Sequence, residues 1–171
     1  MIILLTGGSG CGKSTYAERI VAALPREKRV YLATMQICDE ESVQRVRRHR
    51  AQRADLGFAT VECEKDLASA PMEDGSVVLL EDLVNLVANE MFGGGDVDRI
   101  APALDALAAG CRHLIMVTND VFSDGEAYEP STKAYLRALA EVNAHAAALA
   151  DCVAEVVYSI PVCLKGELPC V

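Results

Sequence analysis

The sequence lacks several features that mark whole classes of protein. No apolar run approaches the roughly 18 residues that a membrane-spanning helix needs. Positive charge is in the minority, since 16 Lys and Arg stand against 25 Asp and Glu and the formal net charge at pH 7 is −9. This charge argues against attachment to DNA or to an anionic membrane through the overall field of the protein. We therefore expect neither a membrane span nor a nucleic-acid partner.

The cysteines and the amino-terminal residues both favour a cytoplasmic protein. The seven cysteines are scattered and form no Cys-x-x-Cys pair, which is typical of reduced thiols in the cytosol and not of a zinc site. Met1–Thr6 is apolar but has no basic leader and runs directly into glycines. This segment predicts a buried strand and not an export signal.

The 171 residues have room for one domain and alternate short apolar runs with longer helical patterns. Runs such as Ile2–Leu5 and Val77–Leu80 do not alternate polar and apolar residues, as in strands that helices cover on both faces. This pattern predicts an α/β fold of three layers in a single domain, residues 1–171, with a mostly parallel central sheet and helices on both faces. We expect strands at Ile2–Thr6, Arg29–Ala33, Phe58–Glu62, Val77–Glu81, Leu114–Thr118 and Val153–Ser159, a short edge strand or hairpin at Ile160–Val171, helices at Lys13–Leu24, Glu40–Arg53, Leu83–Phe92, Val97–Gly110 and Ser131–Ala150, and loops at Gly93–Gly95 and Ser123–Pro130.

A glycine-rich motif follows the first expected strand and precedes the first expected helix. It reads Gly7-Gly8-Ser9-Gly10-Cys11-Gly12-Lys13-Ser14 and matches G-x-x-x-x-G-K-[ST]. Glycine lets the backbone curl so that successive N–H groups converge on phosphate oxygens. Lys13 is placed to reach the β and γ oxygens, and Ser14 to bind Mg²⁺. The motif predicts a P-loop NTPase-type fold that binds GTP or ATP with Mg²⁺; the weaker alternative is a glycine turn formed by chance.

Two carboxylates follow the apolar run Val77–Leu80, at the carboxyl end of an expected strand. Ligands bind at that end in open parallel sheets. We assign Glu81, in preference to Asp82, to the Mg²⁺ shell and expect its strand to neighbour the strand before the P-loop. The alternative is a solvated acidic strand end. Thr118–Asp120 closes another strand, and either lines the same crevice or forms a structural turn.

An otherwise acidic chain gathers five arginines around one histidine within residues 45–53. On a helix Arg45, His49 and Arg53 share a face, because they are four residues apart. Nearby positive charge favours the neutral imidazole that attack on phosphorus requires, and arginines offset charge on phosphate oxygens. The hypothesis is that His49 attacks a nucleotide α-phosphorus and carries the nucleotidyl group as a phosphoramidate. The alternatives are a solvated basic helix face and an RNA-contacting patch.

Five motifs occur in the order, and near the distances, found in one protein family. They are Thr6-Gly7-Gly8 with Gly12-Lys13-Ser14, Tyr31-Leu32-Ala33-Thr34, Asp39-x-Glu41, Arg45-x-x-x-His49-x-x-x-Arg53 and Leu79-Leu80-Glu81. Through them the sequence resembles the bifunctional adenosylcobinamide kinase/adenosylcobinamide-phosphate guanylyltransferase family of cobalamin biosynthesis. The resemblance spans most of the chain and is most specific in residues 1–62 and 77–92.

The resemblance implies a cytoplasmic enzyme, commonly a homotrimer, whose partners are a corrinoid substrate and a nucleoside triphosphate. It implies phosphorylation of the aminopropanol hydroxyl of adenosylcobinamide, followed by transfer of GMP from GTP through a histidine-bound guanylyl group. His49 matches the family's guanylylated histidine, and Lys13 and Glu81 match its P-loop lysine and strand-end glutamate. On the same basis Thr34 and Glu62 join the expected nucleotide-binding residues.

The departures from the family pattern lie mainly in the C-terminal half, where Phe122 stands at a position that is glycine in the family. They bear on acceptor and intersubunit surfaces more than on the P-loop. A divergent member with a changed acceptor is therefore one alternative. The others are a small-molecule kinase whose basic helix only clamps phosphates, and a non-catalytic regulatory protein that binds nucleotide.

Overall fold

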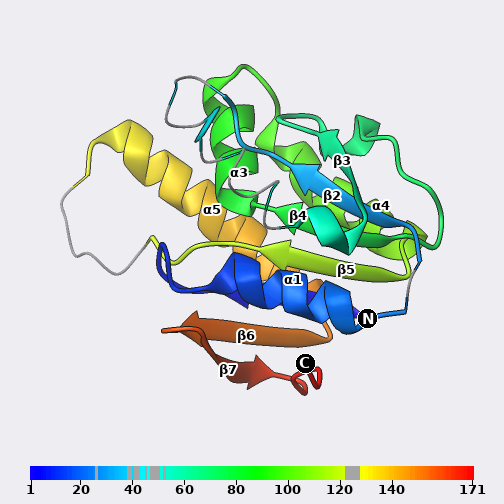
Figure 1. The fold of residues 1–171 in the computed structure, drawn as a ribbon. Coiled ribbons are helices and arrows are strands. Elements are labelled where there is room, and N and C mark those ends of the chain that lie inside the picture. Colours follow the sequence, from blue (N-terminus) through cyan, green and yellow to red (C-terminus); the bar gives the residue numbers. More distant parts are fainter. Residues whose placement is uncertain are drawn as a thin grey trace.

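The computed structural model describes residues 1–25, 27–37, 40, 43–44, 46, 51, 53–121 and 128–171. The strands are β1 (Ile2–Thr6), β2 (Arg29–Ala33), β3 (Phe58–Glu62), β4 (Val77–Glu81), β5 (His113–Val117), β6 (Cys152–Val157) and β7 (Ile160–Lys165). The helices are α1 (Lys13–Ala23), α3 (Leu83–Phe92), α4 (Ile100–Gly110) and α5 (Pro130–Leu149), with 3-10 turns η1 (Ala54–Leu56), η2 (Leu67–Ser69) and η3 (Val97–Arg99). Figure 1 shows their arrangement.

The strands form one sheet in the order β3-β2-β4-β5-β1-β6-β7. Every neighbouring pair is parallel except β6 and β7, which form an antiparallel hairpin at the sheet edge. Because six strands run in the same direction, their carboxyl ends meet at one edge of the sheet. Glu81 is the last residue of β4, and the P-loop and Asn119 follow β1 and β5, so all of them lie at this edge.

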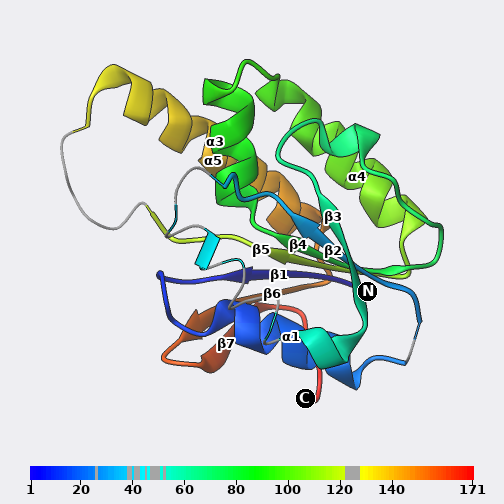
Figure 2. The same cartoon turned by 45° about the horizontal axis from the view of Figure 1, so that its top comes forward.

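Helices cover both faces of the sheet, which confirms the three-layer α/β prediction. Figure 2 shows α1 on one face and α3, α4 and α5 on the other. In β1, Leu4 points into the core beneath α3, α4 and α5, while Ile3 and Leu5 belong to the core beneath α1. Successive strand residues point to opposite faces, so a strand covered on both sides buries every residue of this run.

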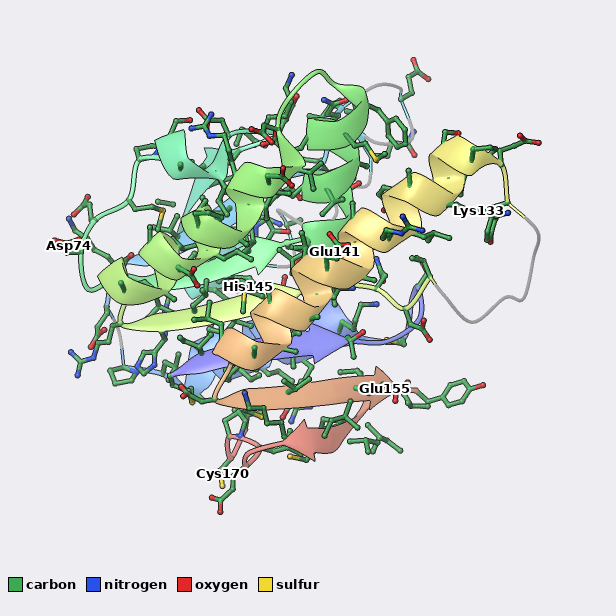
Figure 3. The ribbon with its side chains drawn as sticks, turned by 180° about the vertical axis from the view of Figure 1, so that it is seen from behind. Asp74, Lys133, Glu141, His145, Glu155 and Cys170 are labelled. Atoms are coloured by element: carbon green, nitrogen blue, oxygen red, sulfur yellow. The ribbon has the colours of Figure 1, made fainter. Side chains whose placement is uncertain are left out.

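The two longest helices of the second layer pack beside each other (Figure 3). His145 on α5 is half-buried, and its Nε2 lies 2.8 Å from Oδ1 of Asp105 on α4. The contact joins α4 to α5. It gives His145 a structural partner.

Most of the expected elements occur within one or two residues of their predicted bounds. The expected helix Val97–Gly110 instead begins as the 3-10 turn η3 and becomes α-helical at Ile100. Pro102 has no N–H to bond the carbonyl of Asp98, so the α-helical hydrogen-bond pattern does not extend through this turn. Pro130 was expected in a loop but is the first residue of α5, a position that proline favours.

Two expected segments lie partly outside the described residues. Of the expected helix Glu40–Arg53, the described residues Glu40, Val43, Gln44, Val46 and Ala51 are helical. Arg45 and His49 lie outside the described residues. The same holds for residues 123–127 of the expected loop Ser123–Pro130. The hairpin of β6 and β7 confirms the expected edge strand or hairpin at the carboxyl end.

Candidate active site

The P-loop curls between β1 and α1 and is held by the hairpin of β6 and β7. Gly7 and Gly12 have φ values of 137° and 100°, which favour glycine. A Cβ at Gly7 would clash with the carbonyl oxygen of Val156, and one at Gly12 would clash with Ser159. The N–H of Ser159 donates to the carbonyl oxygen of Cys11 at 2.7 Å. The edge hairpin therefore braces the phosphate loop from outside.

Lys13 begins α1 and folds back over this loop. Its side chain is 6% exposed, and its Nζ donates to the carbonyl oxygens of Gly7 at 2.9 Å and Gly8 at 2.7 Å. The ammonium group thus stands at the centre of the curl of backbone amides. A positive charge in this position matches the P-loop function predicted for Lys13.

Glu81 is the carboxylate that faces the P-loop helix. The hydroxyl of Ser14 donates to Glu81 Oε1, and the hydroxyl of Tyr31 donates to Oε2 at 3.2 Å. A serine hydroxyl and a carboxylate in contact beside a phosphate loop fit Mg²⁺, which is commonly bound by one or two protein oxygens together with phosphates and water. These residues therefore suit the metal that the sequence predicts.

The expectation that the acidic strand neighbours β1 is wrong, because β5 lies between β1 and β4. Ser14 and Glu81 still come into contact, because α1 packs across β5 and β4. Ser14, in the first turn of α1, is thereby brought to the end of β4. The P-loop helix therefore makes a connection that strand pairing does not make.

Asp82, the residue after Glu81, caps a helix. Its Oδ1 accepts from the N–H of Asn85 at 2.7 Å and caps the N-terminus of α3. Burial raises the pKa of Asp82 to about 6, with Glu81 acting in the same direction and the Asn85 hydrogen bonds opposing it. The geometry thus agrees with the choice of Glu81 as the carboxylate next to Ser14.

A cavity of about 450 Å³ opens at this edge of the sheet. Its walls come from the P-loop, from strand ends and from the segment that follows β2. The lining residues are Ser9, Gly10, Cys11, Gly12, Lys13, Ser14, Tyr31, Ala33, Met35, Val46, Arg53, Glu62, Glu81, Asp82, Asn85, Val117 and Asn119. Most of the predicted nucleotide-binding residues within the described chain are therefore brought together around one space.

Thr34 differs from the other predicted nucleotide-binding side chains of the described chain, because it does not line the cavity. It is fully buried, its hydroxyl donates to the carbonyl oxygen of Asp82 at 2.8 Å, and it accepts from the N–H of Asp82 at 2.7 Å. Its hydroxyl therefore satisfies the backbone at the end of β4. Gly7 and Gly8 also lie outside the lining, and contribute the carbonyl oxygens that hold Lys13.

Arg53 reaches the cavity from the end of the predicted basic helix. It is only 5% exposed, and its guanidinium carbon lies 3.6 Å from the ring centroid of Tyr31. Val46 lines the same cavity, seven residues earlier in the chain. The described ends of this segment thus border the space next to the P-loop, and His49 lies between them in sequence.

Among the residues not identified as site residues from the sequence, Tyr31 and Glu18 interact with Glu81 and Arg53. Tyr31 lies inside β2, and a strand covered on both faces gives no sequence signal of which face meets a ligand. Glu18 lies four residues after Ser14 on α1. This spacing, which is visible in the sequence, puts both side chains on the same face of the helix. Burial raises the pKa of Glu18, Glu81 adds to this effect, and Arg53 opposes it.

Nearly the whole chain matches one known protein family. The model of the family described as cobinamide kinase / cobinamide phosphate guanyltransferase matches residues 3–164. The chain belongs to this family. The resemblance read from the sequence motifs is thereby confirmed.

Two curated members of the cobinamide kinase / cobinamide phosphate guanyltransferase family are similar along their whole length. The bifunctional adenosylcobalamin biosynthesis protein CobU of Salmonella typhimurium is 32% identical, and the protein of the same name from Escherichia coli is 34% identical. Each alignment covers 96% of this chain and 100% of the relative. The similarity therefore extends through the C-terminal half.

Solved structures support the P-loop fold of this family member. The flagellar accessory protein FlaH from Methanocaldococcus jannaschii aligns with a TM-score of 0.53 at 14% identity, over 97% of this chain and 78% of that chain. An ATPase domain of solved structure aligns with a TM-score of 0.50 at 9% identity, over 90% of this chain and 68% of that chain. At these identities the likeness shows the fold alone.

Among the residues described, no helix has the length and apolar character needed to cross a membrane.

Proposed function

We propose that this protein phosphorylates the hydroxyl of adenosylcobinamide with a nucleoside triphosphate and then transfers GMP from GTP to the new phosphate. The observation that carries the proposal is the single cavity that joins two kinds of group. Lys13, Ser14 and Glu81, which we assign to phosphate and metal, line this cavity together with Arg53 from the arginine-rich segment. Family membership supplies the acceptor and the second reaction.

In the first stage the P-loop amides and Lys13 hold the phosphates of the nucleoside triphosphate. The Lys13 ammonium exchanges its bonds to the loop carbonyls for bonds to the β and γ oxygens. Mg²⁺, when bound, neutralises charge that develops on these oxygens, and Ser14 and Glu81 would hold it. The acceptor hydroxyl attacks the γ-phosphorus, the bond from that phosphorus to the β,γ-bridging oxygen breaks, the nucleoside diphosphate leaves, and the hydroxyl proton passes to solvent. Positioning with charge neutralisation supplies most of the catalysis.

In the second stage His49 attacks the α-phosphorus of GTP, a phosphorus–nitrogen bond forms and pyrophosphate leaves. The phosphate made in the first stage then attacks the guanylyl phosphorus and displaces His49. Arg45 and Arg53 offset the charge on the phosphate oxygens. The burial of Arg53 in the cavity lining supports this assignment, and so does Val46, which also lines the cavity and lies three residues before His49 in the chain.

The test of the second stage is labelling of the protein with α-labelled GTP and Mg²⁺. The wild type should acquire a label that is labile to acid and stable to base, as expected of a phosphoramidate. His49→Ala should abolish the label and leave the kinase reaction in place. Label that persists in His49→Ala would contradict the assignment, and a wild type that shows kinase turnover without any label would indicate a kinase alone.

We also propose that the enzyme works with Mg²⁺ in the cytoplasm as a homotrimer. Exposed apolar side chains on β7, namely Ile160, Val162 and Leu164, support self-association because such a surface is normally covered in an assembly. The negative formal charge and scattered cysteines support the cytoplasmic location.

A further inference from the structure

Tyr31 lines the active-site cavity and lies between Glu81 and Arg53. It belongs to β2, is 6% exposed, and still contributes to the cavity wall. Its hydroxyl donates to Glu81 Oε2 at 3.2 Å, and the guanidinium of Arg53 stands over its ring at 3.6 Å. One side chain therefore contacts both the carboxylate of the metal site and the arginine of the second phosphate site.

The ring itself is fixed from a second direction. Phe58, the first residue of β3, meets Tyr31 edge-on, with ring centroids 5.8 Å apart and planes at 75°. This T-shaped contact leaves one face of the Tyr31 ring to Arg53. An arginine over an aromatic face is attracted by the ring quadrupole, more strongly where both groups are withdrawn from water. Arg53 and Tyr31 are both buried, so this contact fixes the guanidinium at the cavity wall.

The hydroxyl is suited to hold a carboxylate through a change of metal occupancy. A tyrosine phenol keeps its proton at neutral pH, so the Tyr31 hydroxyl donates to Glu81. Ser14 holds the other oxygen of Glu81. If the Ser14 hydroxyl turned to a metal ion, the Tyr31 hydroxyl would still be placed to donate to Glu81.

We infer that Tyr31 is a positioning residue for both stages of the reaction. Its hydroxyl orients Glu81 for the metal and phosphate end, and its ring orients Arg53 for the guanylyl-transfer end. The part that concerns Arg53 rests on the function proposed above. The part that concerns Glu81 needs only a P-loop site for a nucleotide with Mg²⁺.

Two substitutions of Tyr31 test its contacts with Glu81 and with Arg53 separately. Tyr31→Phe removes the hydroxyl and keeps the ring under Arg53. We expect it to raise the Mg²⁺ concentration for half-maximal binding of a non-hydrolysable GTP analogue about tenfold, the size of one hydrogen bond to a charged group. Guanylylation of His49 at saturating Mg²⁺ should stay near the wild-type rate.

Tyr31→Leu removes the ring as well. We expect the same shift in Mg²⁺ dependence and, in addition, guanylylation slowed about three- to tenfold at saturating Mg²⁺, because Arg53 loses its support. The control is Tyr16→Phe, a buried tyrosine of α1 outside the cavity lining. It should leave both measurements unchanged. Thermal unfolding of each variant checks that the fold is retained.

A double-mutant cycle with Glu81→Gln tests whether the hydroxyl acts through Glu81. If it does, Tyr31→Phe should change the Mg²⁺ dependence of nucleotide binding in the wild type and change it little in the Glu81→Gln background. Wild-type Mg²⁺ dependence in Tyr31→Phe, or an equal shift in both backgrounds, would overturn the inference for Glu81. An unchanged guanylylation rate in a folded Tyr31→Leu would overturn it for Arg53.

The outcomes separate this inference from the proposed function. A wild type that binds nucleotide with Mg²⁺ but neither transfers phosphate to the corrinoid nor becomes guanylylated would refute the proposed function. The binding measurements would then still decide the contact between Tyr31 and Glu81, since they need no acceptor.

Discussion

At the scale of single residues, Lys13 shows how one buried charge organises the phosphate site. Its ammonium donates to two loop carbonyls, and an uncharged side chain in its place removes this positive charge from the position where the phosphates would bind. We expect Lys13→Ala to lower kinase turnover about 10²- to 10³-fold, as for loss of one preorganised electrostatic group. Steady-state kinetics with adenosylcobinamide and ATP or GTP measure the effect.

The matched control for Lys13 is Lys28→Ala. The Lys28 side chain is 69% exposed and pairs with Glu73 on the surface, away from the cavity lining. This variant should retain wild-type turnover. Circular dichroism and thermal unfolding should show both variants folded. Near-normal turnover by a folded Lys13→Ala would contradict the P-loop assignment.

At the scale of elements, the first residue of β5, His113, has a side chain that makes stability depend on pH. Burial lowers the pKa of His113, the Met1 amine and Arg112 act in the same direction, and Glu27 opposes them. The unfolded chain therefore binds more protons than the folded one as the pH falls through the ordinary range of histidine. The free energy of unfolding contributed by this group accordingly rises with pH and is lost on acidification.

We expect His113→Gln, which removes this titration, to flatten the pH dependence of stability. Relative to the wild type, the variant should lose less free energy of unfolding between pH 7.5 and about pH 5.5, on either side of the ordinary histidine pKa. Urea unfolding at a series of pH values measures the difference. Parallel curves for the two proteins would show that His113 does not titrate between the folded and unfolded states in this range.

The elements themselves were predictable because their signals are local. The run Val77–Leu80 predicts a strand covered on both faces, and the structure buries all four of its residues. The functions of Thr34 and Tyr31 were not predictable in the same way. Thr34 bonds Asp82 and Tyr31 bonds Glu81, both at the end of β4. A single sequence does not reveal which strand ends lie together.

At the scale of the whole molecule, the strand order decides how the site is assembled. β5 separates β1, the strand before the P-loop, from β4, which carries Glu81. Helix α1 nevertheless brings Ser14 into contact with Glu81. The same order leaves β7 at the edge of the sheet, next to the hairpin turn that braces the P-loop through Ser159. An assembly formed through β7 would therefore lie close to the phosphate loop.

The exposed residues of β7 make this assembly testable. Ile160, Val162 and Leu164 are 65%, 45% and 59% exposed, an apolar edge that proteins normally cover or charge. We expect Leu164→Lys to lower the molar mass measured by light scattering toward that of a single chain, since an interface there would bury an unpaired charge. Ala109→Lys, on an exposed position of α4, adds the same charge away from β7 and should leave the mass unchanged. A wild type that is monomeric, or a Leu164→Lys protein with the mass of the wild-type assembly, would contradict an interface at this edge.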